Sequence, residues 1–248
     1  MRRSIVVAGT VVTGAAIAAA VARRPLKAHL AEGTLPGRSG SWLNSYMNRP
    51  GYRLMAAALD LKPEDDLLDV ACGWGEFLAV HGSEARHVAG IDVSGEKVTL
   101  ARQRLADRIA AGTAEVVQGD AAALPWKEGT FSAVTCIDAF IFFPAPERVL
   151  AEVRRVLRPG GRMLMQIGMK WPHGLPKHMP HPNPHGHDYS DEAAVRRMVE
   201  NAGFGEVSIS YGLVFGEHRL ANRVSRVMGG SDEVRLVGAV KPEAGSAH

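Results

Sequence analysis

Short apolar runs alternate with helix-like segments along most of the chain, and this alternation restricts the folds that it can adopt. Nearly continuous apolar runs, as expected for strands covered on both faces, occupy residues 66–72, 87–93, 114–119, 131–138 and 161–168. Segments with helical length and spacing lie between them, at residues 75–83, 95–111 and 146–157. The order predicts an α/β fold with a doubly wound, mostly parallel sheet.

The C-terminal part continues this pattern after an irregular stretch. Residues 190–204 predict a helix with Ser190 as its N-cap and Gly203 at its end. Two further strand-like runs follow, at residues 206–215 and 232–242, and they complete the predicted sheet.

The composition of the 248-residue chain is that of a globular protein with one or two domains. The formal net charge is only +3 and the basic residues are scattered, so no nucleic-acid partner is predicted. The two cysteines, Cys72 and Cys136, both lie in apolar runs, which favours buried, reduced thiols.

The N-terminus differs from the rest of the chain. Residues 4–22 carry no charge and are flanked on both sides by pairs of arginines, and their length just spans a bilayer. Three interpretations stay open: a membrane anchor, a cleaved signal peptide (the twin-arginine type included) and a poorly ordered extension. The resulting division is an N-terminal apolar segment at 1–24, a linker at 25–40 and a globular domain at 41–248.

A glycine-rich turn joins the first strand-like run to the first helix. The stretch LLDVACGWGEF (67–77) contains Gly73 and Gly75, which permit unusual dihedral angles and close approach of the backbone to a ligand. Asp92 and Asp120 stand where the next two strands end, at the edge where open α/β sheets bind ligands. A carboxylate after the second strand is placed to hold two ribose hydroxyls, and one after the third to accept from an adenine amino group. The alternative is purely structural: an ordinary turn, with the acids as caps.

Four stretches in order resemble the motifs of class I S-adenosylmethionine-dependent methyltransferases, over roughly residues 60–240. They are LLDVACGWGEF (67–77), GIDVSGEKVTLARQR (90–104), VQGDAAALPW (117–126) and the run from FSAVTCID to RPGGRMLM (131–165). The resemblance implies a Rossmann-like sheet of seven strands with an antiparallel last strand, S-adenosyl-L-methionine as cofactor, and no metal. The cofactor-binding residues that it implies are Asp69, Ala71, Cys72, Gly73, Gly75, Asp92, Val93, Asp120, Ala121 and Ile137.

Two alternatives for the glycine turn are disfavoured. The dinucleotide fingerprint G-x-G-x-x-G needs a third glycine where this chain has Leu78, so a nicotinamide-dependent dehydrogenase fits poorly. Cys72 stands inside the turn with no histidine near it in the sequence, so we interpret it as a small core residue and not as a nucleophile.

The implied reaction is in-line methyl transfer to a small acceptor, and the acceptor side is less well defined. Residues 169–192 contain five histidines and five prolines. A metal site at His178, His181, His185 and His187, a lid with a general base among His185, His187 and Tyr189, and a solvated loop all stay open.

The other wall of the acceptor pocket is expected to come from aromatic residues, and we expect at least two of the three phenylalanines to be core residues. The candidates are Trp42, Tyr46, Tyr52, Phe140, Phe142 and Phe143. Aromatic walls beside an apolar N-terminus predict a lipophilic acceptor, and the pattern resembles methyltransferases of quinone precursors and sterols. A catalytically silent cofactor-binding module and a membrane-tethered scaffold are the alternatives.

The methyl donor is made in the cytoplasm, so we expect the domain to face the cytoplasm, with membrane contact through residues 4–22.

Overall fold

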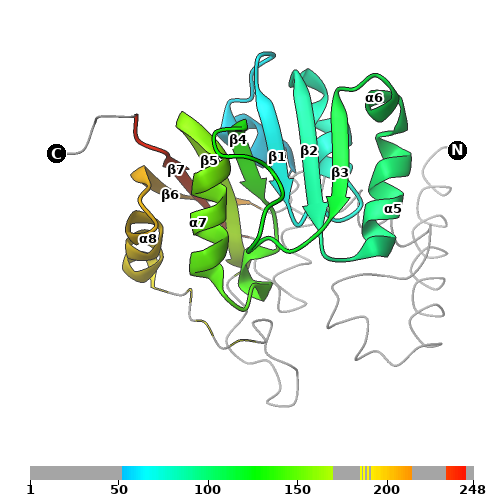
Figure 1. Cartoon of the computed structure of the whole chain (residues 1–248). Coiled ribbons are helices and arrows are strands. Elements are labelled where there is room, and N and C mark those ends of the chain that lie inside the picture. The colour runs from blue at the N-terminus through cyan, green and yellow to red at the C-terminus, as the bar shows by residue number, and fades with distance from the viewer. Residues whose placement is uncertain are drawn as a thin grey trace, which may run out of the picture. The chain divides into compact units, whose positions relative to one another are not determined.

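Seven strands form one mixed sheet in the order β3-β2-β1-β4-β5-β7-β6 (Figure 1). The structure is a computed structural model that describes residues 52–169, 185, 187, 189, 191–213 and 233–243, all within a compact unit at residues 48–248. The predicted segments 1–24 and 25–40 lie outside the described residues, as do Trp42, Tyr46, His178, His181 and Ser190.

The strands occur in the predicted segments and have the predicted directions. Their bounds are β1 Asp66–Val70, β2 His87–Asp92, β3 Ala114–Gln118, β4 Phe131–Cys136, β5 Leu157–Met169, β6 Gly205–Leu213 and β7 Glu233–Val240. The first five strands run parallel, whereas β7 is inserted antiparallel between β5 and β6. This confirms the predicted α/β sheet with its antiparallel last strand.

The described helices differ from the prediction mainly at their ends. They comprise residues 52–59, α4 Glu76–Val80, α5 Gly95–Arg104, α6 Ala106–Ala110, α7 Pro146–Val156 and α8 Glu192–Asn201, with 3₁₀ turns η1 Gly82–Glu84 and η2 Phe140–Phe142. The predicted helix at 95–111 is interrupted at Leu105, whose backbone (φ −100°, ψ 15°) leaves the helical region. The prediction of Ser190 as N-cap of α8 is wrong, because the carboxylate of Asp191 accepts the capping hydrogen bond from the Ala193 N–H at 2.9 Å.

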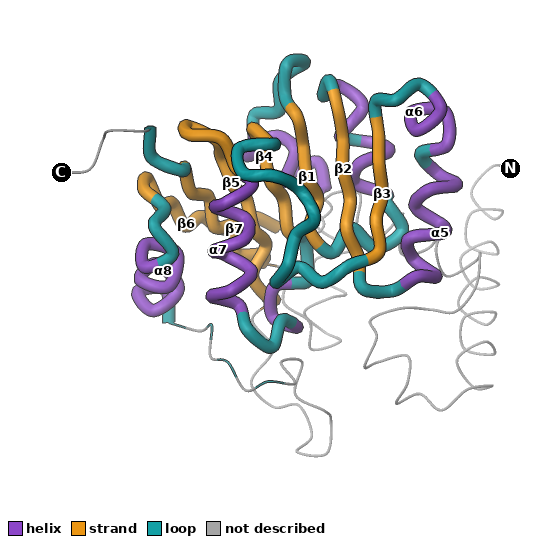
Figure 2. Tube along the Cα trace, in the orientation of Figure 1, coloured by secondary structure: helices purple, strands orange, loops and turns teal. Residues whose placement is uncertain are grey.

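Both faces of the sheet are covered by helices (Figure 2), which is why the central strand β1 is buried along its whole length. Leu68 and Val70 of β1 point into a core shared with α7 and α8. Leu67, between them in alternation, points into a second core shared with α4, α5 and residues 52–59. No helix among the described residues is long and apolar enough to cross a bilayer.

Candidate functional site

The glycine turn after β1 is held in a left-handed backbone conformation at three positions. The φ angles are +58° at Ala71, +54° at Gly73 and +70° at Gly75. A Cβ on Gly75 would lie 3.0 Å from the Cβ of Ala101 in α5, so the turn packs tightly against that helix. A Cβ on Gly73 would meet no atom within 4 Å. The turn is therefore closed on the α5 side and open at Gly73, where a ligand could approach the backbone.

Asp92, at the end of β2, is bonded directly to this turn. Its Oδ2 accepts a hydrogen bond from the Gly73 N–H at 2.9 Å, and its Oδ1 accepts one from the Ser94 N–H at 2.9 Å. Ser94 itself caps α5 by accepting from the Lys97 N–H. Each carboxylate oxygen has two lone-pair positions, so both oxygens of Asp92 can accept a further hydrogen bond from a ligand.

Asp69 lies beneath the turn, buried in β1. Its Oδ1 accepts a hydrogen bond of 2.8 Å from the Thr135 hydroxyl of β4. Burial raises the pKa of Asp69 to about 7, the hydrogen bond from Thr135 opposes this rise, and the negative charge of Asp92 adds to it. The site thus holds two acidic groups close together, and their repulsion would be relieved by a cation.

The other residues predicted to bind the cofactor lie around these two acids in different environments. Val93, directly after Asp92, leaves 76% of its surface exposed, which is unusual for a large aliphatic side chain. Asp120 is exposed and caps its own loop by accepting from the Ala122 N–H at 2.9 Å, while Ala121 is buried. Ile137 is half-buried after β4.

Cys72 is a packing residue, as its sequence position indicated. The side chain is buried, and burial raises the pKa of its thiol, so the nucleophilic thiolate is disfavoured. A Cβ on Gly90 of β2 would lie 2.8 Å from the sulfur of Cys72, so the missing side chain of Gly90 makes room for it. Cys136 is likewise buried and free.

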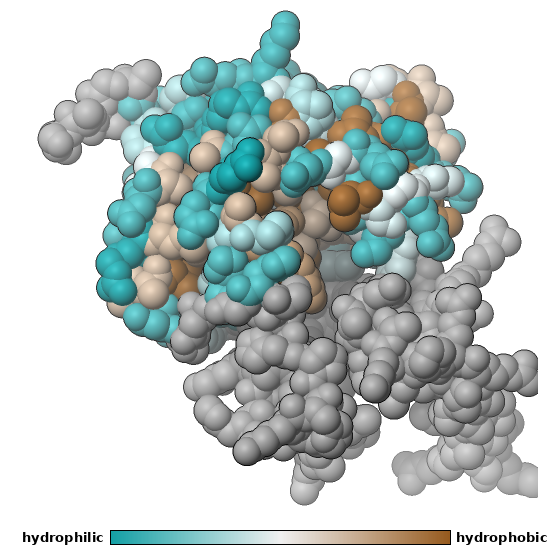
Figure 3. Space-filling model, turned by 60° about the horizontal axis from the view of Figure 1, so that its bottom comes forward, coloured by the Kyte–Doolittle hydropathy of each residue, from teal (hydrophilic) through white to brown (hydrophobic). Residues whose placement is uncertain are grey.

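The aromatic residues after β4 divide between core and surface. Phe140 is fully buried, Phe143 packs against the same core, and Phe142 leaves 45% of its surface exposed. This confirms that at least two of the three belong to the core. Tyr52, another candidate for the wall of the acceptor pocket, packs edge-on against Phe77 of α4. On the face seen in Figure 3, the described surface is mostly hydrophilic, with small, separate apolar areas.

The three candidate bases lie near one another. The rings of His185 and His187 are 6.4 Å apart, and those of His187 and Tyr189 are 6.0 Å apart. Tyr189 also packs against Phe140, and burial raises its pKa to about 12. At neutral pH the phenol of Tyr189 is therefore protonated and unsuited to act as a base. Among the described residues, no group of three or more histidine, cysteine or acidic side chains is arranged to hold a metal ion.

Asp138 was not singled out in the sequence, although it follows β4 as Asp92 and Asp120 follow β2 and β3. It adopts a left-handed backbone (φ +54°), and its Oδ1 accepts a hydrogen bond from the side-chain amide of Gln166 in β5. The sequence signal is the run FSAVTCID (131–138), in which an acid closely follows an apolar strand.

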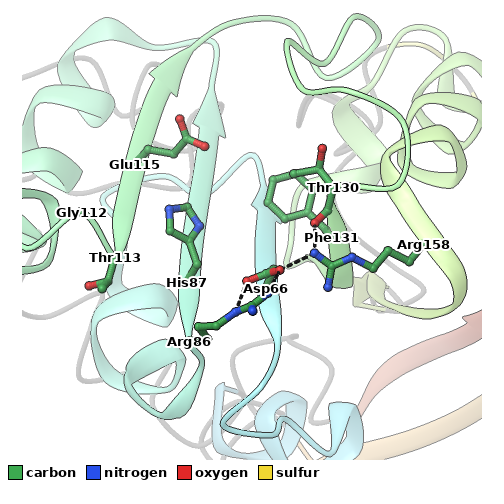
Figure 4. Close-up of a pocket in the computed structure, with 9 residues that line it drawn as sticks. All are labelled: Asp66, Arg86, His87, Gly112, Thr113, Glu115, Thr130, Phe131 and Arg158. Carbon is green, nitrogen blue, oxygen red and sulfur yellow. Dashed lines mark hydrogen bonds and ion pairs between the residues drawn. The ribbon is translucent and has the colours of Figure 1, made fainter.

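A hollow of about 510 Å³ lies at the opposite edge of the sheet, away from the glycine turn (Figure 4). Asp66 lies between the guanidinium groups of Arg86 and Arg158, and both donate to its carboxylate. These hydrogen bonds outweigh the effect of burial and hold the pKa of Asp66 below its usual range. Because both arginines are held by Asp66, we interpret the hollow as structural.

Comparison with known proteins shows which family shares these features. A family model described as a methyltransferase domain matches residues 68–165. A ubiquinone/menaquinone biosynthesis C-methyltransferase from Methylobacterium nodulans is 43% identical over 101 residues, which are 40% of each chain. A sterol 24-C-methyltransferase from Gibberella zeae is 34% identical over 116 residues, 43% of this chain and 28% of that one. The chain thus spans less than half the length of these relatives.

A solved structure shares the fold. Phosphoethanolamine N-methyltransferase 2 from Haemonchus contortus, in complex with phosphomonomethylethanolamine and S-adenosylhomocysteine, matches with a TM-score of 0.62 at 14% identity. The match covers 78% of this chain and 53% of that one. This match shows the fold, and the domain model identifies residues 68–165 as a methyltransferase domain. Together with the inserted β7, these findings agree with the predicted resemblance to class I S-adenosylmethionine-dependent methyltransferases.

Proposed function

We propose that this protein is an S-adenosylmethionine-dependent methyltransferase that acts on a small, lipophilic acceptor. The observation that carries the proposal is the hydrogen bond between the Gly73 N–H and Asp92, beside a turn whose open side has room for a ligand. Such a site suits a ligand with a hydroxylated sugar and a cationic end, because it presents backbone groups and two carboxylates.

The roles of the individual residues follow from these positions. Asp92 would hold the ribose hydroxyls with the lone pairs that Gly73 and Ser94 leave open. Val93 would cover one face of the adenine with its exposed side chain. Within the described part of the chain, Asp120 accepts one hydrogen bond, from the Ala122 N–H, so its carboxylate has capacity for the adenine amino group.

Asp69 and the turn would hold the amino-acid end of the cofactor. The ammonium group found there would stabilise the ionised form of Asp69, whose pKa is raised in the protein alone. When bound, the cofactor supplies an electrophilic methyl group on a sulfonium, which is already a good leaving group. The protein's own task is then to align the acceptor with that methyl group and to exclude water.

A lipophilic acceptor is supported by the names of two relatives, which act on quinone precursors and sterols. Two exposed apolar side chains, those of Phe142 and Val93, are consistent with an apolar entrance to the site. Membrane contact through residues 4–22 and a domain facing the cytoplasm are further parts of this proposal, supported by the weakly apolar N-terminal sequence and by the source of the methyl donor.

Transfer of labelled methyl groups tests the activity. The full-length chain is incubated with methyl-labelled cofactor and, separately, with a demethylated naphthoquinol, a sterol and phosphoethanolamine. We expect label in the product of the naphthoquinol or the sterol. Cofactor binding without transfer to any of the three would favour a catalytically silent module. A folded protein that binds no cofactor would favour the scaffold.

A further inference from the structure

Asp138 lies at the same edge of the sheet as the glycine turn. It follows β4, the strand that pairs with β1. Residues Asp69 and Thr135 are register partners in the parallel pair β1 and β4, and Asp138 comes three residues after Thr135. The turn that follows β1 and the aspartate that follows β4 are therefore neighbours beyond the carboxyl ends of the two strands, where ligands bind in this class of sheet.

Among the acids that end the first four strands, Asp138 differs in what occupies its carboxylate. Asp69 is buried under the turn, Asp92 accepts from two backbone N–H groups, and Asp120 caps its own loop. Asp138 is exposed, and its Oδ1 accepts from the Gln166 side chain. Among the described residues, this is the one hydrogen bond to its carboxylate, and it leaves Oδ2 open to a molecule that arrives from solvent.

The backbone conformation and the side-chain amide of Gln166 hold this carboxylate in place. Its left-handed conformation is one that aspartate and asparagine adopt more readily than most residues. Gln166 is buried in β5. It directly follows Met165, which pairs with Cys136 of β4. A buried amide that donates to an exposed carboxylate orients it at little entropic cost.

We propose that Asp138 accepts the proton of an acidic hydroxyl on the acceptor, a phenol or an enol, and that Gln166 positions Asp138 for this step. The inference rests on the proposed methyltransferase function and names the acceptor class. The hydroxyl proton passes to Oδ2 of Asp138. The electron pair left on the oxygen, or on its conjugated carbon, forms the bond to the methyl carbon, while the sulfur keeps the electrons of the broken bond and leaves as a neutral thioether.

The other basic groups near the site are less suited to this task. Tyr189 is protonated at neutral pH, and His187 has a ring nitrogen 3.3 Å from the carbonyl oxygen of Pro144. Desolvation by the surrounding protein raises the pKa of Asp138 above its usual range, and the hydrogen bond from Gln166 opposes the rise. Asp138 is thus surrounded by protein that desolvates its carboxylate, and it remains accessible to solvent.

The experiment compares two probes, one with a hydroxyl proton and one in which a methyl group replaces that proton. The full-length chain is loaded with S-adenosylhomocysteine, and the binding of 1-naphthol and of 1-methoxynaphthalene is measured by calorimetry. We expect the wild-type protein to prefer 1-naphthol by about tenfold or more. Asp138→Asn, which keeps the left-handed backbone, should abolish this preference. Asp107→Asn, an exposed aspartate of α6, is the matched control and should retain it.

Further variants keep the test decisive. Asp138→Gly also accepts the positive φ and replaces Asp138→Asn if that variant does not fold. Gln166→Leu removes the bond that stabilises the ionised carboxylate, so the pH at which the preference appears should move upward. No preference in the wild-type protein, no binding of either probe, or a preference retained by Asp138→Asn would overturn the proposal. Failure to bind S-adenosylhomocysteine would instead overturn the proposed function.

Discussion

The N–H of Gly73 donates a hydrogen bond of 2.9 Å to Oδ2 of Asp92, which joins the turn after β1 to the loop after β2. Because Ser94 donates to the other oxygen, one carboxylate holds two ligand-facing loops in place before any ligand arrives. This arrangement reduces the ordering cost of binding, which favours affinity. It also makes Asp92 important to the local structure as well as to the ligand.

Ala71 occupies the left-handed position (φ +58°) at which a glycine would be unstrained. We expect Ala71→Gly to raise the free energy of unfolding by up to about 1 kcal/mol, because the relief of strain exceeds the added entropy of the unfolded chain. Urea unfolding measures this. As a control, Ala151→Gly at an exposed position of α7 should lower stability by about 1 kcal/mol. If both variants lose stability equally, the strain at Ala71 is absent.

Asp69 should make stability depend on pH near neutrality. Burial raises its pKa in the folded protein to about 7, so the folded state binds this proton more tightly than the unfolded state does. The contribution of Asp69 to stability is therefore fully favourable below pH 4 and is lost as the pH rises toward 7, by at most roughly 1.4 kcal/mol per pH unit.

The variant Asp69→Asn isolates this effect, because an amide keeps an acceptor for Thr135 and carries no charge. Unfolding free energies of the wild type and of this variant are measured from pH 5 to pH 8 without ligand. The wild type should lose stability relative to the variant as the pH rises. A difference that stays constant over this range would show that Asp69 does not titrate there.

Asp66 should matter for stability and not for the cofactor. It is paired with Arg86 and Arg158 at the edge opposite the turn, and both arginines are partly exposed. We expect Asp66→Asn to lower the free energy of unfolding by about 1–2 kcal/mol. The affinity for S-adenosylmethionine should change less than twofold. A large loss of affinity with unchanged stability would mean that the hollow beside Asp66 binds a ligand.

The sequence predicted the sheet well because burial on both faces makes its central strands nearly continuous apolar runs. The glycine turn and the acids Asp92 and Asp120 were also predictable, since each follows such a run directly. The cap of α8 was misplaced by one residue because Ser190 and Asp191 are both good caps, and only the backbone geometry decides between them.

Other features depend on contacts between distant segments. The environment of Asp69 depends on Thr135, 66 residues away, and the orientation of Asp138 depends on Gln166, 28 residues away. The strain at Ala71 is hidden in the sequence, because alanine gives no sign of a left-handed backbone.

Calorimetric titration with S-adenosylmethionine tests the central claim most directly. The full-length wild-type chain is compared with Asp92→Ala and with Asp107→Asn, which changes an exposed acid in the first turn of α6. We predict micromolar binding by the wild type and by Asp107→Asn, and an affinity at least about tenfold lower for Asp92→Ala, a loss of about 1.4 kcal/mol. A folded wild-type protein that does not bind, or an Asp92→Ala variant with unchanged affinity, would contradict the assignment of the cofactor site.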